Sequence, residues 1–166
     1  MIAMTLALFA SALVLSATAS VPPPMEGDDR TAILATINAL FDRLGTADGE
    51  GFREVLAPEG TIFIHNLMDP ADPKLIVRSN AIMTDREGPD EHRLTEKMGI
   101  PTVFQRGDMA HVWVPYAFWI DGEKSHCGID SISLSRSEGA WRVTNMSYTV
   151  EPTERCAELG APESPE

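Results

Sequence analysis

Basic residues are scarce in this sequence. Its 166 residues include 13 Lys and Arg against 25 Asp and Glu, so the formal net charge is −12 at pH 7. A surface with this charge repels the phosphate backbone of nucleic acids and the anionic headgroups of lipids. We therefore expect neither nucleic acid nor a membrane surface as a partner, and we attribute the excess negative charge to solubility.

Charged side chains are absent altogether from residues 1–20. An apolar run there is followed by the small residues Ala17, Thr18 and Ala19, a pattern typical of a signal peptide cleaved near Ala19. The sequence thus predicts a signal peptide over residues 1–19, a linker over residues 20–27, and a periplasmic or secreted mature protein. The alternative is an uncleaved membrane anchor, because about 20 apolar residues can span a bilayer.

Only two cysteines are present, Cys127 and Cys156, and both follow the predicted signal peptide. In an oxidising compartment such a pair usually forms a disulfide, which would tie a flexible C-terminal tail over residues 152–166 to the preceding domain. Free thiols or an intermolecular link are the alternatives. Two cysteines at this distance do not form a zinc site, and the sequence lacks a nucleotide-binding loop and a nucleophile elbow. We therefore expect no metal and no cofactor.

Apolar residues recur at helical spacing after Asp28, and Gly45 ends the pattern. Strand-like alternation dominates the last third of the chain. The predicted helices cover residues 28–44, 48–56 and 81–86, the predicted strands cover residues 61–65, 74–78, 109–120, 125–135 and 141–150, and residues 87–98 are ambiguous. Helices that come first and an antiparallel meander that comes last predict one α+β domain over residues 28–151, with its helices packed on one face of a curved sheet.

Three polar residues lie on the apolar face of this predicted sheet. Alternation turns Tyr116 inward among apolar neighbours, and in the next strand it turns His126 and Asp130 inward. His126 and Asp130 are four strand residues apart, about 13 Å, which is too far for a direct dyad. A carboxylate on an apolar face costs several kcal/mol unless it is paired or neutral, so Asp130 is a candidate functional group. The alternatives are a buried neutral imidazole at His126 and a structural hydrogen-bond acceptor at Asp130.

The turn at residues 121–122 sets which of these residues face one another. A two-residue loop would turn the two apolar faces against each other, so we expect a three-residue loop over residues 120–122. The resulting strand pairs are Tyr116 with His126 and Val114 with Gly128. Gly128 then leaves open space on the inner face, which we interpret as part of a ligand pocket.

Aromatic residues also lie on the opposite face of the predicted sheet. His111, Trp113 and Trp119 form a stripe that points outward. A stripe of this kind on a soluble domain is more often covered by a partner subunit than left bare.

Residues 110–116, 121–122, 125–130 and 141–143 together resemble the nuclear transport factor 2-like superfamily, also called SnoaL-like, in an exported bacterial branch. The resemblance covers about residues 28–156. It implies a cone-shaped α+β barrel, in which N-terminal helices pack in a curved, mostly antiparallel sheet and leave an apolar cavity at the open end. Many members form dimers through the outer sheet face, so the resemblance also implies a homodimer.

The superfamily includes isomerases, dehydratases, polyketide cyclases, epoxide hydrolases and non-catalytic binders, so the fold leaves the function open. The leading hypothesis is an exported binding or accessory protein that holds a small apolar or amphipathic molecule in its cavity. The residues expected to contact this ligand are Phe41, His65, Val114, Phe118, Gly128 and Asn145, with His65 alternatively a core or rim histidine. One alternative is an acid/base isomerase or lyase acting next to a carbonyl, with His126 as general base and Tyr116 and Asp130 as donors. The second alternative is a homodimeric interaction module without a ligand.

Overall fold

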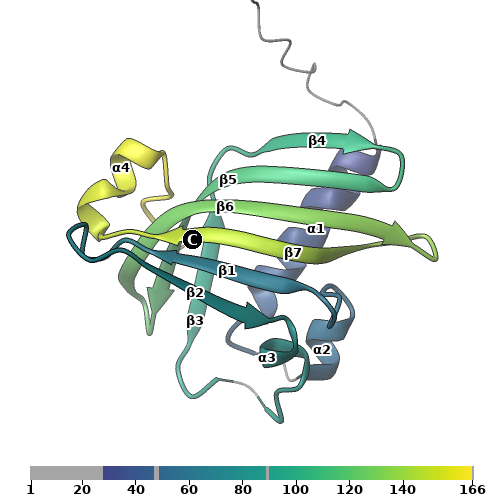
Figure 1. Ribbon diagram of the computed structural model, residues 1–166, viewed down its shortest axis with the longest axis horizontal. Coiled ribbons are helices and arrows are strands. Elements are labelled where there is room, and N and C mark those ends of the chain that lie inside the picture. The colour runs from purple at the N-terminus through teal and green to yellow at the C-terminus, as the bar shows by residue number, and fades with distance from the viewer. Residues whose placement is uncertain (1–27, 47–48, 89, 166) are drawn as a thin grey trace, which may run out of the picture.

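The computed structural model describes residues 28–46, 49–88 and 90–165, so the predicted signal peptide and linker lie outside the described residues. In chain order the elements are α1 (Asp28–Arg43), α2 (Gly49–Arg53), β1 (Thr61–Asn66), β2 (Lys74–Ser79), α3 (Ala81–Thr84), β3 (Leu94–Met98), β4 (Thr102–Arg106), β5 (Met109–Ile120), β6 (Glu123–Ser137), β7 (Ala140–Val150), the 3-10 helix η1 (Thr153–Arg155) and α4 (Cys156–Leu159) (Figure 1). None of the helices in this part of the chain is long and apolar enough to cross a membrane.

Helix α1 is amphipathic and supplies one wall of the core. Ile33, Ile37, Leu40 and Phe41 recur at helical spacing, are buried, and belong to the same apolar cluster as the inward residues of the sheet. Figure 1 shows α1 crossing behind β5, β6 and β7, so the helix covers one face of the sheet and leaves the other face free. The predicted α+β class is confirmed.

In the part of the chain that the structure describes, seven strands form one mixed, curved and unclosed sheet. The strand order is β2-β1-β7-β6-β5-β3, and β4 also pairs with β5. Only β1 and β7 run parallel within these pairs, so the expected mostly antiparallel sheet is confirmed. Because the sheet curls without closing, its concave face extends beyond the part that α1 covers.

The β5–β6 hairpin departs from the predicted register. Its turn has only two residues, Asp121 and Gly122, with φ values of 53° and 89°, as a tight turn between twisted strands requires. A β-bulge at Ser125 then adds one residue to β6 and returns the following side chains to the inner face. The three-residue loop was therefore wrong, although a single consistent inner face was expected correctly. The observed pairs are Phe118 with His126, Tyr116 with Gly128, and Val114 with Asp130.

Strands β3 and β4 lie in a part of the chain for which no strand was predicted. Both strands pair with β5, whose 12 residues are long enough for β3 and β4 to pair with separate halves of it. Strand β3 pairs with the half from Tyr116 to Ile120, and β4 pairs with the half from Met109 to Trp113. These short strands were hard to predict because a long neighbour, rather than their own sequence, stabilises them.

The segment predicted as a flexible tail contains two short helices, η1 and α4, over residues 153–159. Cys156 in this segment is bonded to Cys127 of β6, so the predicted disulfide is present. The segment covers Trp119, which is only 2% exposed, in a small second core that also contains Ala117 and Ala161. Trp119 therefore does not extend the outer aromatic stripe as predicted, because the C-terminal segment buries it.

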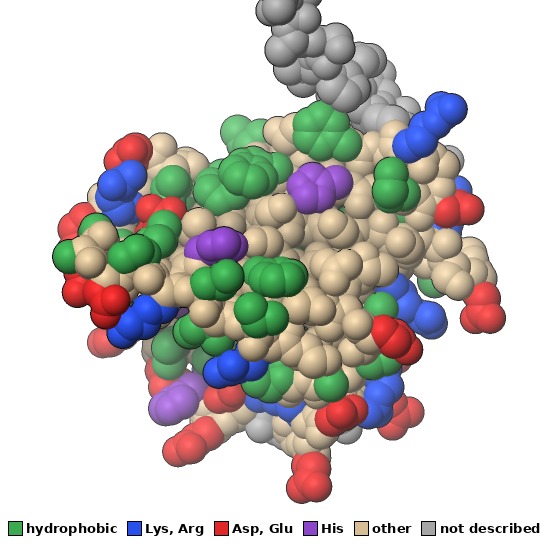
Figure 2. Space-filling model, in the orientation of Figure 1, with side chains coloured by type: hydrophobic (Ala, Val, Ile, Leu, Met, Phe, Trp, Pro, Cys, Tyr) green, Lys and Arg blue, Asp and Glu red, His purple; other side chains and the backbone are tan. Residues whose placement is uncertain are grey.

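The outer face of the sheet has few charged side chains. Figure 2 shows hydrophobic and histidine side chains spread over this face, with acidic and basic side chains gathered round its edge. Phe63, Leu75, Val77 and Trp113 contribute exposed apolar side chains to it. A partly apolar face with few charged side chains, on a chain of net charge −12, differs from the rest of the surface.

The disulfide should contribute strongly to stability. We expect Cys156→Ser to lower the free energy of unfolding of the oxidised protein by about 3 kcal/mol, because the bridge joins residues 29 positions apart and restricts the unfolded chain. Urea unfolding of wild type and variant, each with and without dithiothreitol, measures this effect. The reduced wild type should resemble the variant, and equal stability of the two oxidised proteins would contradict the bridge.

Candidate functional site

A cavity of about 490 Å³ opens on the concave side of the sheet, where α1 and α3 border it. Its wall is mainly apolar and includes Leu40, Phe41, Leu44, Ile62, Ile64, Met146 and Phe118. The polar and charged residues of the wall are Arg78, Arg86, Asp90, Glu96, Tyr116, His126, Asp130 and Tyr148. A mostly apolar pocket of this volume with a few convergent polar groups is typical of small-molecule sites.

Glu96 and Asp130 form a carboxyl pair in this wall. Asp130 of β6 is buried between Val114 of β5 and Tyr148 of β7, and Glu96 comes from the middle of β3. Their side chains share a hydrogen bond. No N–H or hydroxyl group of the described residues donates to the buried Oδ2 of Asp130. Because an ionised carboxylate can only accept hydrogen bonds, the hydrogen bond between Glu96 and Asp130 requires a proton on one of the two groups. Nor do the described residues contain a group of three or more His, Cys, Asp or Glu that could hold a metal ion.

Burial keeps protons on this pair. Burial, followed by the charge of Asp130 and the hydrogen bond with it, raises the pKa of Glu96 well above its ordinary value. Burial also raises the pKa of Asp130 to about 7, while the hydrogen bond from Glu96 acts in the opposite direction. Near neutral pH, Glu96 is therefore the protonated member and Asp130 is the member that titrates. Together they can donate a hydrogen bond to a ligand and accept one from it.

Two tyrosines flank the pair, and they differ in what their hydroxyl groups do. Tyr116 donates to the backbone oxygen of Thr149 at 2.7 Å, so its hydroxyl is committed to the protein. The hydroxyl of Tyr148 has no hydrogen-bond partner among the described residues, and its ring lies in the cavity wall. Burial, with the charges of the two carboxyl groups next, raises the pKa of both phenols. The hydroxyl of Tyr148 can therefore donate to a ligand, whereas the hydroxyl of Tyr116, the predicted donor, already donates to the backbone.

His126 lies at the same end of the cavity as an uncharged ring. It stacks on Phe118 with ring centroids 4.9 Å apart and meets Tyr116 edge-on at 5.8 Å. Burial lowers the pKa of His126 to about 4, so the imidazole is neutral near pH 7. A general base works best when its pKa is close to the working pH. The base role predicted for His126 therefore fits Asp130 better.

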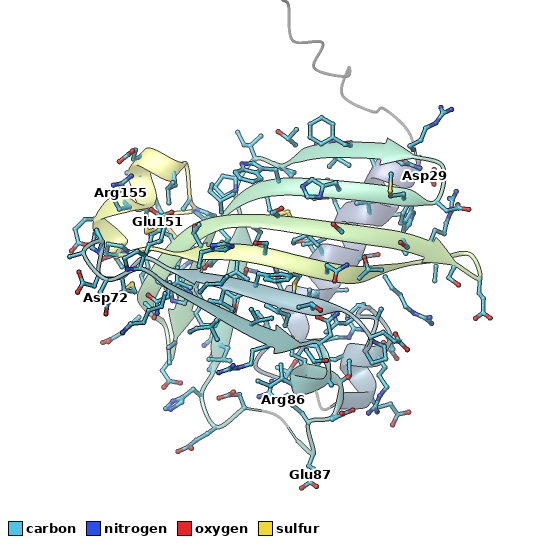
Figure 3. The ribbon with its side chains drawn as sticks, in the orientation of Figure 1. Asp29, Asp72, Arg86, Glu87, Glu151 and Arg155 are labelled. Carbon is cyan, nitrogen blue, oxygen red and sulfur yellow. A yellow bond between two sulfur atoms is a disulfide. The ribbon has the colours of Figure 1, made fainter. Side chains whose placement is uncertain are left out.

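Two arginines line the cavity at its border, in different environments. Arg86, labelled beside α3 in Figure 3, forms a salt bridge with Asp90 at 2.8 Å and donates to the backbone oxygen of Leu44 at 3.1 Å. These contacts fix the loop after α3 to the end of α1. Arg78 of β2 is exposed, and its guanidinium donates only to the adjacent carbonyl of Val77, at 3.1 Å, among the described residues.

The structure brings five of the predicted site residues together in one wall. These residues are Phe41, Tyr116, Phe118, His126 and Asp130. The four strand residues converge because period-two alternation turns the even-numbered residues of β5 and β6 inward, and Phe41 faces them from α1.

His65 and Asn145 lie away from the cavity, although ligand contacts were predicted for both. Each is exposed on the outer face of the sheet. The same alternation turns their neighbours Ile64 and Met146 into the cavity wall, so His65 and Asn145 must face the other way.

Val114 and Gly128 also fall outside the cavity wall. Val114 is completely buried in the core beneath the sheet. Gly128 leaves no room for a ligand, because a Cβ atom there would come within 2.0 Å of the backbone oxygen of Thr149. The glycine therefore permits a close approach of β7 to β6.

Two important residues of the site were missed from the sequence. Glu96 alternates with Leu94 and Met98, a pattern that would have turned a carboxyl inward had residues 87–98 been assigned as a strand. Tyr148 shares the inward face of β7 with Met146, so alternation alone could have identified it.

Comparison with known proteins identifies the fold. No protein-family model matches the sequence, and no curated protein matches it significantly. An NTF-2 like protein of unknown function from Silicibacter pomeroyi has a similar structure, with a TM-score of 0.52 and 16% identity over 74% of this chain and 95% of that chain. For an NTF2-like protein from Cytophaga hutchinsonii the TM-score is 0.57 and the identity 12%, over 75% and 99%. For the S. rosetta CaMKII hub the values are 0.55 and 15%, over 76% and 99%. The chain thus has the predicted nuclear transport factor 2-like fold, and function has to be argued from its own residues.

The carboxyl pair should make stability fall as pH rises. Because folding raises the pKa of Glu96 and of Asp130, the native state binds more protons than the unfolded chain above about pH 4. The stabilisation is complete below that pH and is lost through about pH 7 for Asp130. Between about pH 4.5 and 8, wild type should lose on the order of a few kcal/mol of unfolding free energy relative to the double variant Glu96→Gln, Asp130→Asn. Urea unfolding at stepped pH measures this loss, and parallel profiles for the two proteins would contradict it.

Proposed function

We propose that the protein binds a small, largely apolar molecule in its cavity and holds one oxygen of that molecule against the Glu96–Asp130 pair. The observation that supports this most is a proton-sharing carboxyl pair in the wall of an apolar cavity of about 490 Å³. A carboxyl kept only for structure is normally satisfied by backbone amides or an arginine, and the buried Oδ2 of Asp130 has neither among the described residues.

Each polar group of the pocket has a distinct part in this binding. Protonated Glu96 and the free hydroxyl of Tyr148 can donate to a carbonyl or hydroxyl oxygen, and Asp130 can accept from a hydroxyl. The apolar wall, including Leu40 and Phe41, covers the body of the ligand and keeps water from the polar end. A small number of oriented polar groups in an apolar cavity wall matches a ligand that has one polar atom and is otherwise apolar.

We further propose that the protein acts outside the cytoplasm and as a homodimer. A disulfide between Cys127 and Cys156 suits an oxidising compartment. The outer sheet face, with exposed Val77 and Trp113 and few charges, suits contact with a second copy. Such a dimer would leave the cavity free, because the cavity is on the concave side.

Isothermal titration calorimetry with 2-naphthol, a rigid apolar molecule with one hydroxyl group, tests the binding proposal. Glu96→Gln and Asp130→Asn should each weaken binding about tenfold, because each change leaves a buried hydrogen-bonding group imperfectly paired. Ile64→Trp should abolish binding by filling the cavity.

Glu151→Gln is the matched control for this experiment. Glu151 is also a buried carboxyl, but it lies at the α4 end of the sheet (Figure 3), accepts from Thr149 Oγ1 at 2.9 Å, and does not line the cavity. Its variant should bind 2-naphthol as wild type does. The proposal fails if wild type does not bind, or if the two cavity carboxyl variants bind as tightly as the control.

A second candidate function is proton transfer next to a carbonyl, as in an isomerase or lyase. It is favoured by the pKa of about 7 at Asp130, which suits a base at neutral pH, next to a protonated acid. Asp130 would take the proton from the carbon beside the carbonyl. Glu96 and Tyr148 would donate hydrogen bonds to the carbonyl oxygen as negative charge develops on it.

Deuterium exchange of 2-tetralone, a bicyclic ketone with acidic C–H groups, tests this second function by NMR in D₂O. The exchange rate should rise with pH through about 7, as Asp130 ionises. Asp130→Asn should lower the rate about 100-fold, and Glu151→Gln should leave it unchanged. No exchange above the buffer rate would exclude this function for such ketones and would leave the binding proposal intact.

A further inference from the structure

Arg78 places a positive charge at the border of a mainly apolar cavity. It lies on the inward face of β2, paired across the strands with Ile62, and it lines the cavity with Ile82 and Met83 of α3. Its exposure puts the guanidinium at the solvent end of the cavity, whereas Asp130 is buried at the other end. The cavity therefore has a cation at its mouth and the carboxyl pair inside.

This guanidinium has no acidic partner among the described residues. Arg43, Arg53 and Arg136 each form a salt bridge, and so does Arg86, the other arginine of the cavity. Arg78 forms no salt bridge, although acidic residues outnumber basic ones almost two to one in the chain (25 against 13). Arg30, Arg93, Arg106 and Arg142 form none either among the described residues, but of these five arginines only Arg78 lines the cavity. Of the acidic residues that line the cavity, Asp90 is the nearest to Arg78 in sequence, and it forms a salt bridge with Arg86 instead.

The sheet fixes the spacing between the two polar ends. Strands β1 and β7 lie between β2 and β6, so Arg78 and Asp130 are separated by three strand spacings, about 14 Å. The long side chain of Arg78 shortens the gap that a ligand must span. The apolar residues Ile62, Ile64 and Met146 line the wall between the two ends.

We infer that the natural ligand is an apolar acid, with a carboxylate bound by Arg78 at the mouth and a hydroxyl or carbonyl oxygen held by Glu96 and Asp130 inside. This inference rests on the proposed binding function and adds the chemical class of the ligand. A planar guanidinium forms two parallel hydrogen bonds with a carboxylate, a geometry that an ammonium or amide group does not reproduce. The partial exposure of Arg78 makes its contribution modest and sensitive to salt.

A matched pair of probes separates this inference from the binding proposal. The probes are 2-naphthol and 6-hydroxy-2-naphthoate, which carries the same hydroxyl group and adds a carboxylate at the far end of the rings. Calorimetry at low salt should show that wild type binds the naphthoate about fivefold more tightly than 2-naphthol. Arg78→Gln should remove this preference, so that the variant binds the two probes with similar affinity, and Arg78→Lys should keep part of it.

Arg106→Gln is the control for a general effect of charge. Arg106 is also exposed on a strand, but it lies at the β4–β5 turn and does not line the cavity. Its variant should keep the full preference for the naphthoate. The inference is overturned if wild type binds both probes equally, or if the preference survives Arg78→Gln. If wild type binds neither probe, the proposed function itself fails.

Discussion

A carboxyl group in the middle of an apolar strand face is the constraint on which this cavity depends. Asp130 lies between Val114 and Tyr148, where an isolated carboxylate would be strongly disfavoured. The second carboxyl, from Glu96, resolves the conflict only when the pair retains a proton. The hydrogen bond with Glu96 that permits the burial of Asp130 therefore also keeps a proton in the cavity wall. That proton can be donated in a hydrogen bond to an oxygen atom of a ligand.

The rest of the fold holds this pair in place from both sides of the sheet. On the concave side, the curl of the sheet brings the edge strand β3 toward β6, while α1 covers only part of the surface and leaves the cavity. On the convex side, the disulfide at Cys127 anchors the C-terminal segment against the same β5–β6 hairpin that carries His126 and Asp130. Rigid strands rather than loops thus position the polar groups, as precise hydrogen bonding of a ligand requires.

Local patterns in the sequence predicted much of this arrangement. Helical spacing identified α1, and period-two alternation turned Tyr116, His126 and Asp130 inward correctly. Non-local features could not be obtained in this way. The bulge at Ser125 changes the strand register, β3 depends on pairing with a distant strand, and the approach of Thr149 fills the space beside Gly128. Glu96 was missed for this reason, and with it the partner that gives Asp130 its chemistry.

The state of the carboxyl pair is the central claim, and carbon-13 NMR of the side-chain carboxyl groups tests it most directly. The signals would be assigned with Glu96→Gln and Asp130→Asn and followed from about pH 3 to 9, a range that covers the ordinary pKa values of both groups. The account predicts that Asp130 titrates near pH 7 and that Glu96 remains protonated beyond its ordinary range, with each signal sensitive to loss of the other group. Independent titration of both carboxyl groups near pH 4 would contradict the shared proton and the function proposed from it.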